Sequence, residues 1–308
     1  MNRILFLLIA LLALSSQGMA QHYNLYGLEI YNPHFKNPAF TGSDKLIQAD
    51  YLRHSHFLFS GNKAFIMATL PGDKSAVGIN FENSVMYTDY SSFAGFGEVG
   101  MKFYNMGVSY NHTFYLSEEI EIHTGVRFGY GKRNFLPALQ GIDSTRQYDT
   151  YYSSLWGVGL DFRNWKLGLS LNLPLAGFSY SLTEDNTLEK EKMSSNGKEF
   201  NFFSKYESQS KRRVTFDPVF GLDCRVGGNK AEWYGYAGGI VQIVDLVGIG
   251  ITAGSLVSVS ANLNILDRAQ LMLGIYGGEK ILQDGLVTAD YKFSPGDKRY
   301  FVQLRINL

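Results

Sequence analysis

The sequence predicts an all-β fold, a transmembrane antiparallel β-barrel of about fourteen strands, with twelve as the alternative count. The chain begins with the pattern of a secretory signal peptide. It contains 33 Gly, 20 Tyr and 22 Phe among 308 residues, and only 18% of its residues are charged. Several stretches alternate apolar and polar side chains, while no stretch after the signal approaches the roughly 18 apolar residues of a membrane helix. A closed barrel is the remaining way to satisfy backbone hydrogen bonds in lipid.

The signal peptide is predicted to cover residues 1–20. A cationic start at residues 1–3 precedes the apolar run 4–14, and small residues follow up to the expected cleavage between Ala20 and Gln21. A membrane-spanning signal anchor is the alternative, but it would need an apolar run of about 20 residues. The full sequence has a net charge of zero, and the exported chain is expected in the outer membrane with lipid around it and without a nucleic-acid partner.

Alternation along the chain predicts which side chains face lipid and which face the lumen. It is clear after Glu119, where one face consists of Ile120, Ile122, Thr124, Val126, Phe128 and Tyr130 and the other of Glu121, His123, Gly125, Arg127, Gly129 and Gly131. The first face is expected to contact lipid. A change of Val126 to Arg should therefore block assembly, whereas polar replacements of Gly125 or Arg127 should be milder.

Two further segments show the same period. Residues 153–163 and 165–173 alternate around a tight turn at Arg163-Asn164, with Trp156 and Trp165 near strand ends on the apolar face, as in an aromatic girdle. The last residues also alternate, with Tyr300, Val302, Leu304, Ile306 and Leu308 on one face. A strand that ends flush with the chain resembles the assembly signal of outer-membrane barrels.

Counting similar segments predicts a barrel domain over residues 45–308. The fourteen predicted strands are 45–54, 62–70, 75–85, 104–116, 119–132, 153–163, 165–173, 213–225, 231–242, 246–254, 256–264, 269–277, 285–293 and 299–308. Short turns are expected near 71–74 and 117–119, and long external loops at 134–152 and 174–212. The second loop carries many charges of both signs, which indicates a solvated loop or, alternatively, one that contacts a partner.

The sequence offers no catalytic constellation, so the chain is predicted not to be an enzyme and to need no cofactor. It lacks G-x-S-x-G, Walker A and H-E-x-x-H motifs. His54 and His56 share a strand face without an evident third metal ligand, and His123 beside Glu121 is read as ordinary lumen polarity, so no metal site is predicted. Cys224 is the single cysteine and cannot form an intramolecular disulfide.

Residues 21–44 are predicted to form a short plug-like segment before the first strand. This segment contains two Asn-Pro pairs, Asn32-Pro33 and Asn37-Pro38, and the second continues as Ala39-Phe40-Thr41-Gly42. Each proline keeps the asparagine before it out of the helical region, and Gly42 permits a tight turn. A fixed, irregular structure is therefore expected, with a plain leader to the barrel as the alternative.

The stretch from Asn37 to Gly42, with Tyr31-Asn32-Pro33 before it, resembles the PorP/SprF family of Bacteroidetes outer-membrane proteins, which is associated with type IX secretion and gliding motility. The resemblance implies a non-catalytic barrel that assists delivery or surface retention of a secreted protein, or links the outer membrane to the periplasmic secretion complex. Its implied partners are a secreted client protein, periplasmic secretion subunits, or both. The alternative is a small-molecule transporter of the FadL or porin kind, because FadL-like barrels also carry an Asn-Pro-Ala segment near their N-terminus.

Overall fold

The computed structural model describes residues 32–42, 46–56, 59–72, 74–87, 99–135, 146–183, 185, 187–193, 197–208, 213–227, 230–243, 246–254, 257–265, 269–277 and 300–307. The predicted signal peptide, its cleavage site at Ala20 and Gln21, and the predicted strand 285–293 lie outside the described residues. Among the described residues, no helix has the length and apolar character needed to cross a membrane.

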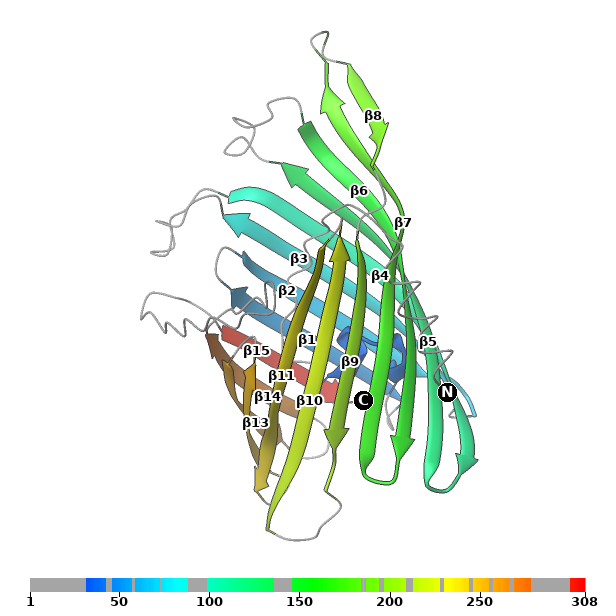
Figure 1. The fold of residues 1–308 in the computed structure, drawn as a ribbon, viewed down its shortest axis with the longest axis vertical. Helices are drawn as coiled ribbons and strands as arrows, with labels where there is room; N and C mark the ends of the chain where they lie inside the picture. Colours follow the sequence, from blue (N-terminus) through cyan, green and yellow to red (C-terminus); the bar gives the residue numbers. More distant parts are fainter. Residues whose placement is uncertain are drawn as a thin grey trace.

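The described chain consists almost entirely of strands, preceded by two single 3-10 turns (Figure 1). The 3-10 turns are η1 (Pro33–Phe35) and η2 (Pro38–Phe40). The strands are β1 (Ile47–His56), β2 (Phe59–Thr69), β3 (Ser75–Tyr87), β4 (Val99–Ser117), β5 (Ile120–Phe135), β6 (Arg146–Phe162), β7 (Trp165–Leu182), β8 (Leu188–Lys192), β9 (Lys198–Tyr206), β10 (Val214–Gly227), β11 (Lys230–Ile243), β12 (Val247–Gly254), β13 (Val257–Ile265), β14 (Ala269–Gly277) and β15 (Tyr300–Asn307).

Fourteen of these strands close into one antiparallel ring. Neighbours along the chain pair with each other from β1 to β7 and from β9 to β15, β7 pairs with β9, and β15 pairs with β1 to close the barrel. β8 pairs only with the far end of β7 and stays outside the ring. The predicted transmembrane β-barrel of about fourteen strands is thereby confirmed.

The two ends of the barrel differ. The connections β2–β3, β4–β5, β6–β7, β9–β10, β11–β12 and β13–β14 meet at one end, here called the turn end, where Arg163 takes a positive φ in the tight turn between β6 and β7. The other end, called the loop end, carries the connections β3–β4, β5–β6, β7–β9 and β14–β15, each spanning ten or more residue positions. Short turns at one end and long connections at the other are typical of outer-membrane barrels.

The predicted pleat is also confirmed. Side chains expected to face lipid are exposed, among them Phe128, Trp156, Trp165 and Leu304, whereas Phe301 and Gln303 of the last strand are buried in the lumen. An exterior of aliphatic and aromatic side chains around a polar interior suits a bilayer, because the strands bond their backbone groups to each other and present apolar surface to lipid.

The predicted long loop 174–212 is wrong in its extent. β7 continues to Leu182, and the rest contains β8 and the whole barrel strand β9. The charges that suggested a loop are tolerated because β9 sends Glu199 into the lumen, where it meets Arg225. Phe200 and Phe202 lie on the other face of β9, whereas Phe203 is buried inside the barrel against Phe40. The loop predicted at 134–152 is likewise shorter, since β5 ends at Phe135 and β6 begins at Arg146. β14 pairs directly with β15, so β9 supplies the strand that the sequence count had placed at 285–293.

Candidate functional site inside the barrel

Residues 32–42, here called the inner segment, lie within the barrel near its turn end (Figure 1). Their hydrogen bonds and contacts reach strands on different sides of the ring, including β1, β5, β10 and β15. Asn32, Asn37, Ala39 and Thr41 are almost completely buried. The segment thus spans the lumen instead of lying along the rim.

Each 3-10 turn begins at an Asn-Pro pair, as the sequence predicts. Asn37 is extended, with φ −129° and ψ 109°, and its side-chain oxygen accepts a hydrogen bond from the Ala39 N–H at 2.9 Å. The proline that follows fits the first position of the turn because its φ is already fixed and it has no N–H to satisfy. Asn32 starts η1 in the same way, but without a side-chain cap.

Asn37 also fastens the segment to the wall. Its amide Nδ2 donates to the carbonyl oxygens of Val158 on β6, at 3.2 Å, and Leu169 on β7, at 3.0 Å. On the other side of η2, the amide of Asn111 on β4 donates to the Ala39 carbonyl at 2.9 Å. Because these groups are buried, losing one partner would leave the other unsatisfied in a poorly hydrated place.

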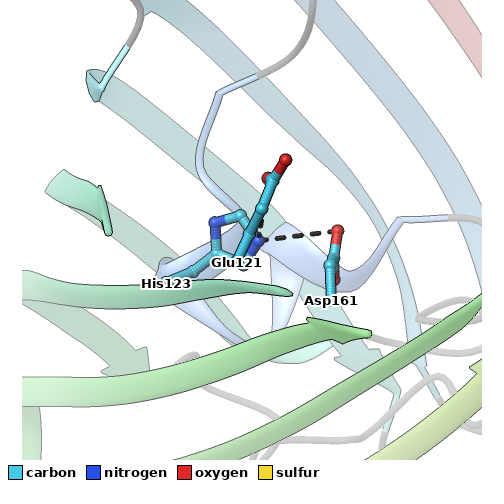
Figure 2. Close-up of side chains that lie close together, drawn as sticks. All are labelled: Glu121, His123 and Asp161. Atoms are coloured by element: carbon cyan, nitrogen blue, oxygen red, sulfur yellow. Dashed lines mark ion pairs between the residues drawn. The ribbon is translucent and has the colours of Figure 1, made fainter. Parts of the chain in front are cut away.

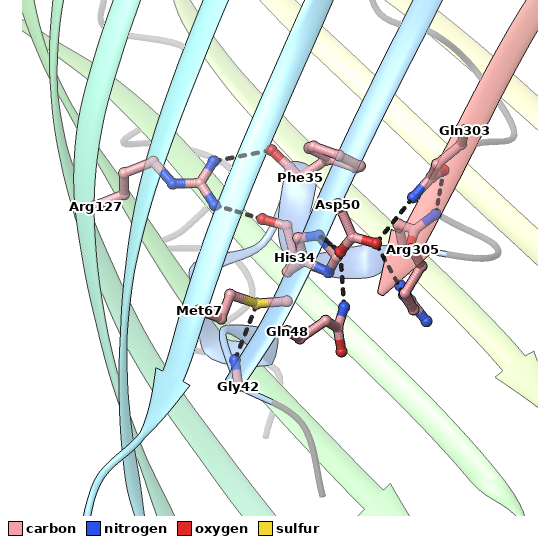
Figure 3. A network of polar contacts seen from close by, with 10 residues as sticks. His34, Phe35, Gly42, Gln48, Asp50, Met67, Arg127, Gln303 and Arg305 are labelled. Carbon is pink, nitrogen blue, oxygen red and sulfur yellow. Dashed lines mark hydrogen bonds and ion pairs between the residues drawn. The ribbon is translucent and has the colours of Figure 1, made fainter. Parts of the chain in front are cut away.

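Arg127 of β5, the strand between β4 and β6, holds η1. Its guanidinium donates to the Phe35 carbonyl at 2.9 Å and to the His34 carbonyl (Figure 3). Its Nε donates to Ser109 Oγ at 2.8 Å. The same guanidinium lies 4.9 Å above the ring of Phe65. This arginine is partly buried and directs all its nitrogens to named acceptors, which is how a cation removed from water is compensated.

Asp50 of β1 is the centre of the second polar network in Figure 3. Its carboxylate lies 3.0 Å from His34 Nε2 and accepts hydrogen bonds from Gln48 at 2.7 Å and Arg305 at 2.9 Å. Asn32 extends the network by donating to Gln303 on β15. The network joins the inner segment to the seam where the last strand meets the first.

Lys36 and Phe35 complete the attachment toward the remaining side of the ring. Lys36 Nζ lies 2.6 Å from the carboxylate of Asp223 on β10, which also accepts from Asn201. Phe35 packs against the buried cluster of Leu52, Met272 and Phe301. Two side chains of the inner segment can carry a positive charge, His34 and Lys36, and each of them faces an aspartate.

Glycines in the wall make room for η2. A Cβ built on Gly125 of β5 would lie 2.4 Å from the backbone of Pro38, and one on Gly157 of β6 would lie 2.0 Å from the side-chain oxygen of Asn37. Gly42 ends the segment with φ +115°, a conformation open to glycine. The glycine richness of the lumen face is thus partly explained by the close approach of the inner segment.

Burial lowers the pKa of His34 below its ordinary value of 6.5. Asp50 works in the opposite direction, and the nearby Arg305 and Arg127 add to the lowering. His34 is therefore neutral at neutral pH while the segment is docked.

The inner segment separates two cavities. The cavity toward the loop end measures about 160 Å³ and is bordered by Phe35, Lys36 and Arg127 with polar side chains of β2, β3 and β9. The cavity toward the turn end measures about 400 Å³ and is bordered by His34 and Phe40. Both are lined by many polar and charged groups.

A second polar cluster lies at the turn end, where Glu121, His123 and Asp161 come together on the lumen wall (Figure 2). Within the described part of the chain, these three residues form the group of at least three potential metal-ligating side chains whose ligand atoms all lie within 4.8 Å of one another. His54, which the sequence analysis considered as a weak metal candidate, is buried on the lumen face of β1 and does not belong to it.

The structure places the residues of the Asn-Pro-Ala motif together. Asn32, Pro33, Asn37, Pro38, Ala39, Phe40 and Gly42 all belong to the inner segment. Sequence reasoning missed their partners Asp50, Arg127 and Asp223, which come from three distant strands. In the sequence, these partners could be recognised only as charged residues on predicted lumen faces. Polar residues are so common on such faces that this feature does not distinguish these three.

No family model matches the sequence, and no curated protein matches it significantly. Solved structures match in fold. The monoaromatic hydrocarbon channel CymD is 8% identical over 94% of this chain and 95% of that chain, with a TM-score of 0.51. The P. putida toluene transporter TodX is 10% identical over 88% and 92%, with 0.47, and the β domain of the Bordetella autotransporter Brka is 8% identical over 86% and 100%, with 0.42. These likenesses concern the fold alone, and the class they describe is the outer-membrane type of β-barrel.

Proposed function

We propose that this chain is a non-catalytic outer-membrane component of a type IX protein secretion system. In this role the barrel helps to deliver a secreted protein to the cell surface, retains it there, or links the outer membrane to the periplasmic secretion complex. The observation that carries the proposal is the placement of Asn37-Pro38-Ala39. The motif by which the sequence resembles the PorP/SprF family is also the part of the chain fixed inside the lumen by β4, β5, β6 and β7.

The proposal treats the inner segment as a plug. Hydrogen bonds from Asn37, Asn111 and Arg127, and the contact between Lys36 and Asp223, tie the segment to the wall on several sides. A closed barrel is a rigid membrane anchor, and rigid scaffolds typically carry their binding functions on the connections between elements. The loop end would then contact the secreted protein, and the turn end would face the periplasmic subunits.

Transport of a small molecule is the second candidate, and the two cavities on either side of the inner segment favour it. The fold of this chain is like that of channels whose names refer to toluene and monoaromatic hydrocarbons. A hydrophobic compound needs a largely apolar passage, however, and the cavity toward the loop end is bordered by Lys63, Glu82 and Arg127. The secretion role therefore remains our proposal.

One strain tests both functions. Asn37 and Pro38 are both replaced by alanine, which removes the cap of η2 and its bonds to β6 and β7 without changing any strand. The secretion role predicts that surface display or release of the client protein falls while uptake of small compounds is unchanged. An Asn83→Ala strain is the matched control, because Asn83 faces outward from β3.

Barrel levels in both strains are compared by heat-modifiable gel mobility, so that an assembly defect is recognised. Normal secretion together with altered uptake of a small hydrophobic compound would overturn the secretion role and favour transport. Unchanged secretion and unchanged uptake in a strain with a normal barrel level would contradict any role of the motif in either function.

A further inference from the structure

We infer that the turn end of the barrel carries a binding site for a divalent transition-metal ion such as Zn²⁺. Its ligands are the carboxylate of Glu121 and the imidazole of His123, both on β5, and the carboxylate of Asp161 on β6 (Figure 2). Imidazole and carboxylate donors are a usual ligand set for zinc, and three protein ligands leave a fourth position for water.

The strand register brings the three side chains together. Glu121 and His123 are two residues apart on β5 and therefore share its lumen face. Asp161 lies directly opposite Glu121 in the antiparallel pairing of β5 with β6. The ligands thus come from two paired strands of a closed barrel, which keeps them close before any ion binds.

The spacing suits a shared ion better than direct contact between the side chains. His123 Nε2 lies 3.5 Å from Asp161 Oδ2 and 3.9 Å from Glu121 Oε2, and Nε2 makes no hydrogen bond within the described structure. Two ligands of a tetrahedral zinc with bonds of about 2.0–2.1 Å are separated by about 3.4 Å. A small adjustment of Glu121, the most exposed of the three, would complete the arrangement.

His123 is also oriented for metal binding. Its Nδ1 lies 2.9 Å from the hydroxyl of Thr113 on β4. When Nδ1 donates to that hydroxyl, Nε2 keeps its lone pair and directs it toward the two carboxylates, which is the usual arrangement of a metal-ligating histidine. Nε2 of His123 and Oδ1 of Asp161 are both buried atoms without a hydrogen-bond partner in the described chain, and such atoms call for an explanation.

The charge around the cluster favours a cation. Like charges directly opposite each other on paired strands are destabilising, and Glu121 faces Asp161 in this way. Lys166 Nζ lies 3.8 Å from Asp161, but it also lies 3.9 Å from Glu207, which in turn contacts Lys205 at 2.9 Å. Asp161 therefore shares Lys166 with Glu207, and within the described residues Glu121 forms an ion pair only with His123, so a divalent ion would supply the positive charge that the facing carboxylates lack.

The first test is a titration of the folded barrel, refolded in detergent without a polyhistidine tag, with Zn²⁺ in a calorimeter. We expect saturable binding of a single ion, weakened at least about tenfold by His123→Gln and by Asp161→Asn. His112→Gln is the matched control, since it removes an imidazole of β4 that is not in the cluster, and it should leave the affinity unchanged. Gel mobility after heating verifies that each variant is folded.

Two further measurements do not depend on the folding of the ligand variants. The wild-type barrel loaded with Co²⁺ should show the intense visible absorption of a tetrahedral site. Lys166→Met, which removes a competing positive charge, should tighten Zn²⁺ binding by roughly fivefold. Absence of saturable Zn²⁺ binding to the wild type, or binding that His123→Gln leaves unchanged, would overturn the assignment.

Discussion

At the level of single residues, glycine and asparagine determine how the inner segment meets the barrel wall. Gly125 and Gly157 leave the space that η2 occupies, and Asn37 supplies both the cap of η2 and two bonds to the wall. The sequence analysis expects polar replacements of Gly125 and Arg127 to be milder than Val126→Arg, and the structure adds a cost that this expectation did not include. Both residues do face the lumen, but both also contact the inner segment.

A methyl group at Gly125 should therefore destabilise the docked segment. A Cβ there would lie 2.4 Å from the Pro38 backbone, which has no flexible end to move, so we expect Gly125→Ala to cost about 1–3 kcal/mol. Gly129→Ala is the control on the same strand and face, because its Cβ would come closest to the movable Ser153 hydroxyl, at 3.0 Å, and would reach the Met106 carbonyl oxygen only at an ordinary 3.7 Å. Urea unfolding of the two variants measures the difference. Equal loss of stability in both would contradict the close approach of Pro38.

His34 should make the docked segment sensitive to acid. Its pKa is lowered in the folded barrel, so protonation favours the state in which the segment is released and His34 regains its ordinary pKa of 6.5. Stability should therefore be full above about pH 7 and should fall as the pH drops through 6.5 toward the lowered value. Thermal unfolding of the wild type and of His34→Gln, measured between about pH 7.5 and pH 5.5, checks this. The same pH dependence in both proteins would exclude His34 as its source.

At the level of elements, periodicity in the sequence predicts most of the barrel. Strands with a clean alternation, such as β5, β6 and β15, lie where the pattern places them because lipid on one side and a polar lumen on the other impose a period of two. The sequence pattern did not predict β9, because its lumen face carries charged residues and the chain on either side of it is also rich in charged residues. The fully exposed β8 carries no such signal. The far end of β7 does alternate, with Phe178, Tyr180 and Leu182 separated by serines, and the strand predicted over 165–173 stopped short of it.

The candidate site was only half predictable. The two Asn-Pro pairs predict a fixed segment, because proline restricts the conformation of the residue before it. This effect is local and can therefore be read from the sequence. The partners Asp50 and Asp223 are brought to the segment by ring closure, which a linear pattern does not encode. The same holds for Asp161, which reaches Glu121 only through the pairing of β5 with β6.

The assignment of faces on β5 can be tested by charge. Val126→Arg would place a guanidinium on the lipid face, at a cost of roughly 2–4 kcal/mol near the bilayer midplane, and should reduce the amount of assembled barrel. Gly129→Ser, on the lumen face and away from the inner segment, should assemble normally. The fraction of heat-modifiable barrel in isolated membranes is the measurement. Similar yields for both variants would contradict the observed pleat.

At the level of the whole molecule, the fold predicts location in the outer membrane, and the sequence predicts removal of a signal peptide. The barrel presents apolar side chains around its circumference, and the sequence before the inner segment has the pattern of a cleaved signal. The mature chain should therefore begin at Gln21 and fractionate with the outer membrane. Mass-spectrometric analysis of the N-terminus after membrane fractionation checks both points, and a retained Met1 or a soluble periplasmic pool would contradict them.

At the level of the whole molecule we also propose that the inner segment closes the barrel. The segment contacts strands on several sides of the ring, and Phe35 packs against the buried cluster of Leu52, Met272 and Phe301. The most direct measurement is the ionic current through single barrels in a planar bilayer, for the wild type and for a variant that lacks residues 32–42. The wild type should remain closed and the variant should show stable open steps, whereas steady currents of equal size in both would show that the segment does not close the barrel.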